Sequence, residues 1–243
     1  MIKQKGLIGI AVAAALLSGN AYAGTVTNPL LGGSVIISDG STTTWNLPNN
    51  TYTTNPDGTF TYANSLNNRT WGFTWDITVD PDPLISGSLA ITNNTSVTKH
   101  FDFLFTLPVG SPFASPALKS GSLGASFQDL NNSGAATLSN INWSGRIDGS
   151  DAMSLFSGGF TCLGAGCNGS IGTVSDGPLS SSGVNTNIGM HLAFDLTAGD
   201  KATFNTSFEV TPVPLPAAFW LLGSGVLGLV AVARRRVEAR RLV

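Results

Sequence analysis

The chain has 243 residues, of which 42% are hydrophobic, only 11% are charged and 29 are glycine. Residues 24–212 contain five basic residues against thirteen acidic ones, a formal charge of −8, because seven of the twelve basic residues lie in the two terminal segments. This acidic balance argues against nucleic acid as a partner, since binding to phosphates needs Lys and Arg that release counterions.

The N-terminal segment has the three parts of a secretory signal peptide. Lys3 and Lys5 form a basic region, residues 6–17 form an apolar core, and Ala21 and Ala23 form a small-x-small cleavage site. The alternative is a short uncleaved membrane helix, but the apolar run is short for a span and a cleavage site follows it at once. We expect residues 1–23 to be removed, so that the mature protein begins at Gly24.

Four segments alternate apolar and polar residues with a period of two, which is typical of strands with one buried face. They are residues 71–79, 101–107, 188–196 and 202–210. Turn-forming residues separate the strands, including Asp80-Pro81-Asp82-Pro83, Asn93-Asn94, where we expect a tight hairpin, and Ala198-Gly199-Asp200. The pattern predicts one all-β domain over residues 24–212, an antiparallel β-sandwich rather than a barrel. We expect the Gly/Ser-rich stretch from Ser144 to Gly183 to form long loops on this domain.

The two cysteines, Cys162 and Cys167, lie five residues apart in a glycine-rich segment. In an exported protein this spacing favours a local disulfide. A metal site would need further ligands nearby, and a thioredoxin-like site would need C-x-x-C at a helix start. We therefore predict a structural disulfide and no metal or cofactor.

Several residue groups are candidates for sites of chemistry. His100 with Asp102, and His191 with Asp195, would form a metal site only if the two pairs met. Residues 129–134 have the oxygen spacing of the start of a calcium loop but lack its Glu at the twelfth position. A glycosidase would need paired carboxylates, for which Asp148 with Asp151, or Asp80 with Asp82, are the candidates. The sequence contains no G-x-S-x-G motif.

Aromatic residues outside the clearest strands could bind sugars by stacking on their apolar faces. The candidates are Trp45 and Trp143, with Tyr52 and Tyr62 beside them. Packing in the core is the competing interpretation for each of them.

The C-terminal segment combines a proline motif, an apolar run and a basic end. Residues 217–233 carry no charge and would span about 25 Å as a helix, slightly less than a typical hydrocarbon core. Arg234, Arg235 and Arg236 open a basic tail over 234–243, which the positive-inside rule places in the cytoplasm. The sequence predicts a transmembrane helix whose N-terminal end faces outward.

The segment Val213-Pro214-Leu215-Pro216-Ala217, followed by this span and the arginines, resembles the VPLPA variant of the PEP-CTERM sorting signal. The resemblance covers residues 213–243 and implies sorting by an exosortase, a membrane-embedded cysteine protease of exopolysaccharide-producing Gram-negative bacteria. It also implies an inner-membrane intermediate after Sec-type export, and then a place on the cell surface or in the matrix. An ordinary single-pass anchor is the alternative.

These features together predict an exported, non-enzymatic surface or matrix protein with a structural or adhesive role linked to exopolysaccharide or biofilm. A secreted carbohydrate-binding module is the alternative, and a glycoside hydrolase is a third hypothesis.

Overall fold

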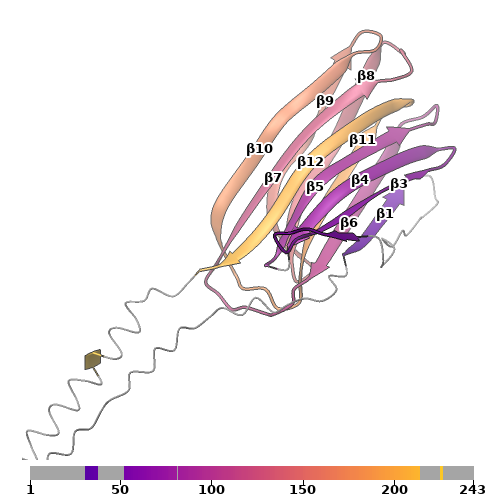
Figure 1. The fold of residues 1–243 in the computed structure, drawn as a ribbon. Coiled ribbons are helices and arrows are strands. Elements are labelled where there is room, and N and C mark those ends of the chain that lie inside the picture. Colours follow the sequence, from indigo (N-terminus) through magenta and orange to yellow (C-terminus); the bar gives the residue numbers. More distant parts are fainter. Residues whose placement is uncertain (1–30, 38–51, 81, 214–224, 227–243) are drawn as a thin grey trace, which may run out of the picture.

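The computed structural model describes residues 31–37, 52–80, 82–213 and 225–226, and it shows an all-β domain (Figure 1). The strands of this described part are β1 Gly32–Ile37, β2 Tyr52–Thr54, β3 Phe60–Asn67, β4 Trp71–Asp80, β5 Leu84–Asn93, β6 Lys99–Pro108, β7 Ala117–Asp129, β8 Ala135–Ile147, β9 Ser150–Leu163, β10 Asn168–Ser181, β11 Asn187–Leu196 and β12 Asp200–Pro212.

The strands form two sheets in which every neighbouring pair is antiparallel. Sheet A has the order β1-β6-β11-β8-β9, and sheet B has the order β10-β7-β12-β5-β4-β3-β2. The sheets pack face to face, and the chain passes from one sheet to the other after β1, β5, β6, β7, β9, β10 and β11. The predicted antiparallel β-sandwich is confirmed.

The four alternating segments supply the core, each as a strand with one buried face. The apolar residues on the inward face of 71–79, 101–107, 188–196 and 202–210, those that recur every second position, are all at most 6% exposed. Phe194 of sheet A lies over Phe204 of sheet B, with ring centroids 4.6 Å apart. Successive side chains of a strand point to opposite faces of the sheet. The alternation therefore identifies which residues of these four segments lie in the core.

Large rings on one sheet sit on glycines of the other. Trp143 of β8 covers Gly121 of β7, where an added Cβ would lie 2.6 Å from the indole. Phe208 of β12 covers Gly145 of β8, where an added Cβ would lie 2.3 Å from the ring. Alternating large and small residues across the interface lets the two sheets interdigitate at close range.

Two local predictions are wrong. The stretch from Ser144 to Gly183 is not a set of loops, because it holds the end of β8 and the whole of the two 14-residue strands β9 and β10. These are edge strands built largely of exposed small residues, so they lack the apolar alternation that reveals a half-buried strand. Asn93-Asn94 does not form a tight hairpin, since β5 and β6 belong to different sheets.

Several predicted features lie outside the described residues. They are the signal peptide with Ala21, Ala23 and Gly24, the side chain of Trp45, the motif from Pro214 to Ala217, and Arg234, Arg235 and Arg236. Of the predicted span 217–233, only residues 225 and 226 are described. A search of the described ranges finds no helix with the length and apolar character that crossing a membrane requires.

Candidate functional site

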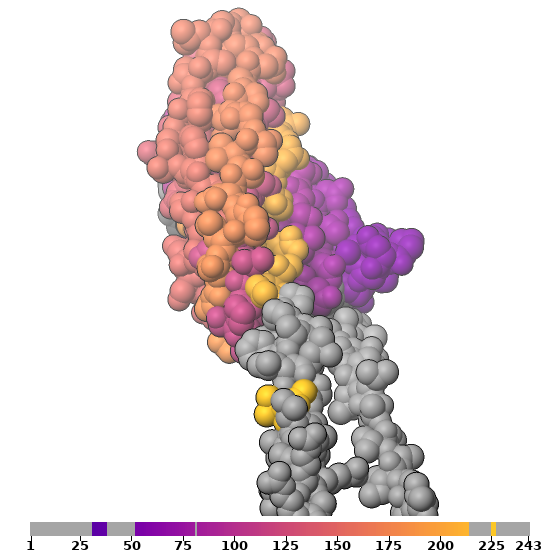
Figure 2. All heavy atoms as spheres, turned by 90° about the vertical axis from the view of Figure 1, so that its left-hand side faces the viewer, coloured from indigo at the N-terminus to yellow at the C-terminus, as the bar shows by residue number. Residues whose placement is uncertain are grey.

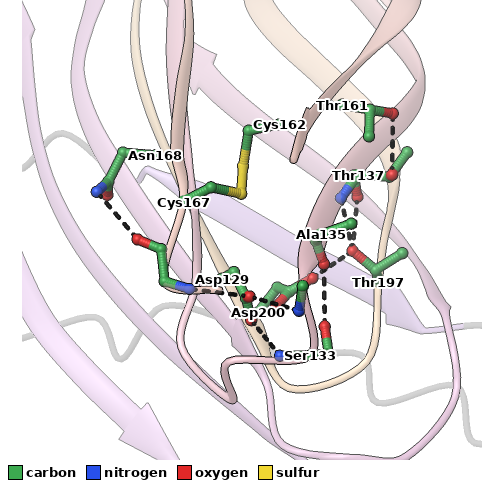
Figure 3. Close-up of a disulfide and its surroundings, with 12 residues drawn as sticks. Asp129, Ser133, Ala135, Thr137, Thr161, Cys162, Cys167, Asn168, Thr197 and Asp200 are labelled. Atoms are coloured by element: carbon green, nitrogen blue, oxygen red, sulfur yellow. Dashed lines mark hydrogen bonds between the residues drawn. A yellow bond between two sulfur atoms is a disulfide. The ribbon is translucent and has the colours of Figure 1, made fainter. Parts of the chain in front are cut away.

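One end of the sandwich is organised around the disulfide and a buried carboxylate (Figure 3). Cys162, the next-to-last residue of β9, is bonded to Cys167, just before β10, with an S–S distance of 2.02 Å. Asp129, at the end of β7, accepts hydrogen bonds at 3.1 Å from the backbone N–H groups of Ser133, Gly134 and Gly166. One side chain therefore holds the β7–β8 loop and the disulfide loop together.

A second acidic residue, Asp200, lies directly opposite Asp129 in the register of β7 and β12. It is fully buried; its Oδ2 accepts a hydrogen bond from the Thr197 hydroxyl, and its Oδ1 has no hydrogen-bond partner among the described residues. Burial and then the charge of Asp129 raise the pKa of Asp200, although the Thr197 hydrogen bond opposes this. For Asp129, burial also raises the pKa, but the backbone N–H donors outweigh it and the net pKa is lowered.

In the β7–β8 loop, the side-chain oxygens that suggested a calcium site accept hydrogen bonds from backbone N–H groups instead. The Asp129 carboxylate binds N–H groups, and Asn131 Oδ1 accepts the Ser133 N–H at 2.8 Å. Calcium would need six or more oxygens turned toward one point. In the described part of the chain no three His, Cys, Asp or Glu side chains are grouped to hold a metal ion.

Replacing Asp200 by Asn should stabilise the protein at neutral pH by about 1–2 kcal/mol, the cost of a buried charged oxygen without a donor. Because the folded pKa of Asp200 is raised, its contribution to stability is present below the unfolded value of 3.8 and lost as the pH rises through the folded value. The gain from Asp200→Asn should therefore vanish near pH 3. Urea unfolding of the wild type and of Asp200→Asn at pH 3 and pH 7 measures this gain. Asp129→Asn is the matched control and should destabilise at pH 7; a stabilising Asp129→Asn would contradict the assignment.

The carboxylates proposed for hydrolysis are engaged in structural contacts. Asp148, in the β8–β9 turn, accepts the backbone N–H groups of residues 185, 186 and 187 at 2.7–3.2 Å. Burial raises the pKa of Asp148, but these donors dominate and lower it to about 2. Asp151 lies 3.0 Å from Arg146 Nε and accepts the Ser144 hydroxyl. Asp80 caps its own turn by accepting the Asp82 N–H. A carboxyl whose pKa is near 2 cannot act as the general acid that glycoside hydrolysis needs.

Asp148→Asn is expected to lower the free energy of unfolding at pH 7 by about 1–2 kcal/mol, after allowance for solvent screening. Asn tolerates the positive φ of 50° at this position, so the change tests the charge rather than the backbone. The depressed pKa gives stability above pH 3.8 that is lost as the pH falls toward 2. Acid titration of both proteins should bring their stabilities together near pH 2, and a constant gap down to that pH would refute this role.

The two histidines pair crosswise with the acids on the outer face of sheet A. His100 of β6 lies 2.5 Å from Asp195 of β11, and His191 of β11 lies 2.9 Å from Asp102 of β6. Asn140 donates to the second oxygen of Asp195. The pairs are thus different from those the sequence suggested, and they link neighbouring strands as cross-strand contacts do.

The aromatic residues proposed for sugar stacking are mostly internal. Trp143 is 0% exposed and its Nε1 donates to Thr206 Oγ1 at 2.7 Å, so the proposed stacking role of Trp143 is wrong. Tyr62 is 3% exposed, and Tyr52 packs against Phe60 and Tyr62. The two-residue period ran through Trp143 as well, but the bulges that interrupt β8 hid it.

The outer face of sheet B contains a polar hollow that the sequence pattern did not predict. Its volume is about 450 Å³, and side chains of β4, β5, β7, β10 and β12 line it. They include Asp76, Thr78, Ser86, Ser88, Ser122 and Asn205. In Figure 2 the atoms of β12 form a yellow band between β10 in orange and the purple strands β3–β5. Alternation marked Asp76, Thr78 and Asn205 as outward-facing, but only the strand order brings them together with the serines of β5 and β7.

A scan against known protein families found no match, and a search of curated proteins found none either. Similar solved structures include the carbohydrate-binding module TmCBM61 in complex with β-1,4-galactotriose, at 9% identity and a TM-score of 0.27, covering 59% of this chain and 88% of that chain. A cyclase from Fischerella sp. TAU in complex with 4-(1H-indol-3-yl)butan-2-one has 11% identity and a TM-score of 0.27, covering 68% and 90%. The Stig cyclase Fisc from the same organism has 11% identity, the same coverage and a TM-score of 0.23. These likenesses are too distant to assign a ligand or an activity.

Proposed function

We propose that the chain is an exported, non-enzymatic bacterial protein that an exosortase sorts to the cell surface or extracellular matrix, where its β-sandwich has a structural or adhesive role linked to exopolysaccharide. The signal-like residues 1–23 and the three-part segment 213–243 support the route. The observation that carries the proposal is the Cys162–Cys167 disulfide, since such bonds persist in oxidising compartments outside the cytoplasm.

The proposed route runs through the Sec machinery, and residues 217–233 hold the chain transiently in the inner membrane. Pro214 and Pro216 would keep the segment before this helix extended, because proline lacks the N–H donor and disfavours helix at the preceding residue. An extended segment at the outer interface is a suitable protease substrate. A secreted carbohydrate-binding module is the second candidate function, and the polar hollow on sheet B favours it.

Cell fractionation of a Pro214→Ala, Pro216→Ala double variant tests the sorting step. The wild-type chain should appear at the surface or in the medium, and the double variant should accumulate at full length in the inner membrane. A variant with Leu242→Ala, outside the motif, is the control and should behave as wild type. Normal release of the double variant would overturn the role of the motif.

A further inference from the structure

The central strands of sheet B carry small polar side chains on their outer face, and this is what makes the face hollow. A side chain cannot be added at Gly87 in the middle of β5, because its Cβ would lie 2.2 Å from the backbone oxygen of Asp76. Around it stand Ser86 and Ser88 on β5, and Asn205 on β12. An outward sheet face in a soluble domain usually bears longer charged side chains, so the composition leaves room here for another molecule.

The polar groups of this face are held by contacts to one another. Ser122 Oγ lies 2.7 Å from Ser207 Oγ across the β7–β12 pair, and Thr61 Oγ1 lies 3.0 Å from Thr78 Oγ1 across the β3–β4 pair. Each hydroxyl has one donor and two acceptor positions, so a paired hydroxyl still has hydrogen-bonding capacity to offer. The rigid sheet backbone fixes the spacing of these groups.

A second hollow continues along the same strands. Its volume is about 120 Å³, and Ser126, Gln128, Lys201 and Thr203 are among the residues that line it. Ser126 is four residues from Ser122 on β7, which corresponds to about 13 Å along a strand. Thr203 and Asn205 are neighbours on the outer face of β12. The two hollows therefore form a polar track that is long enough for several units of a chain-like ligand.

The polarity and charge of the residues that line the track indicate which class of ligand can bind there. The lining of the larger hollow is made of hydroxyl and amide groups, with Asp76 as the one charged residue among them. Residues 24–212 carry a formal charge of −8, which disfavours polyanions, and no aromatic or large aliphatic side chain is among the residues that line the larger hollow. Hydroxyl groups of a neutral sugar chain can donate to Asp76 and exchange hydrogen bonds with the Ser, Thr and Asn side chains.

We propose that the outer face of sheet B binds a neutral glycan chain along the two hollows, through hydrogen bonds rather than ring stacking. This inference rests on the proposed extracellular function and deepens its link to polysaccharide. Single sites of this kind bind weakly, and many copies in a matrix would bind a long polymer by avidity.

Affinity electrophoresis of the full-length protein in mild detergent tests this proposal. The probes are the neutral polymers glucan, galactan, mannan and xylan, with polygalacturonate as the acidic counterpart. We expect retardation by at least one neutral polymer and none by polygalacturonate. An Asp76→Ala, Asn205→Ala double variant should weaken the apparent affinity about tenfold or more, the loss of one to two hydrogen bonds. Asn142→Ala, an exposed Asn on the outer face of sheet A, is the matched control and should bind as wild type.

Equal unfolding midpoints of the three proteins would show that the substitutions leave the fold intact. Retardation by no neutral polymer, preference for polygalacturonate, or equal weakening by Asn142→Ala would each overturn the proposal. A protein that is exported and cut but binds no glycan refutes this inference alone. One that binds a neutral glycan but remains uncut in the membrane refutes the sorting step alone.

Discussion

Replacing Trp143 by Ala is expected to lower the free energy of unfolding by about 3–5 kcal/mol. The side chain is fully buried between the sheets, covers Gly121 and packs edge-on against Phe208 at 6.2 Å. Its removal leaves a cavity and deprives the Thr206 hydroxyl of its donor at 2.7 Å. Urea unfolding followed by far-UV circular dichroism measures the loss.

A Trp143→Phe variant separates packing from hydrogen bonding. It keeps most of the ring but lacks the indole N–H, so we expect a smaller loss, about 1–2 kcal/mol. If Trp143→Ala instead left stability unchanged and abolished glycan binding, the ring would be a surface platform and its position in the core would be refuted.

Asn93→Ala is expected to lower the free energy of unfolding by about 2–4 kcal/mol, because the fully buried amide of Asn93 connects the two sheets. Its Nδ2 lies 2.8–3.1 Å from the carbonyl oxygens of Val97, Leu196 and Thr197, and its Oδ1 accepts from the backbone and hydroxyl of Thr95. Truncation leaves several polar groups at the β5–β6 crossing and the end of β11 without partners.

The neighbouring Asn94 provides the matched control. It is exposed and its Nδ2 makes one long contact, 3.4 Å from the Asn68 carbonyl oxygen. Asn94→Ala should therefore change stability by less than about 0.5 kcal/mol. Thermal and urea unfolding of both variants compare the two positions, and equal effects would contradict the role of Asn93 as an inter-sheet link.

The sequence predicted the core of this fold because apolar and polar residues alternate, with a period of two, in strands that have one buried face. Phe101, Phe103 and Phe105 show it directly, and all are 1% exposed. The same rule failed for β9 and β10, whose residues are mostly exposed and small. One local sequence feature did indicate the hairpin that leads into β9. Asp148-Gly149, between β8 and β9, is a favoured hairpin dipeptide, and both residues have positive φ.

The sites were less predictable because they depend on strand order, which no local pattern encodes. His100 was expected beside Asp102 on its own strand, but its partner Asp195 comes from the neighbouring strand, 95 residues away. Asp129, suggested for calcium binding, and Asp148, suggested for catalysis, proved to be acceptors for backbone N–H groups. In an antiparallel sandwich with many turns, loop ends need such acceptors, so an isolated Asp in a Gly/Asn-rich turn is weak support for chemistry.

The intact mass of the protein recovered from the cell surface and medium tests the central claim most directly. The proposal predicts a species that begins at Gly24, retains the Cys162–Cys167 disulfide and lacks the segment from Ala217 onward, with any attached group seen as added mass. Reduction should add two hydrogens, about 2 Da, to this species. A full-length C-terminus ending at Val243, found only in the inner membrane, would contradict the proposed export and processing.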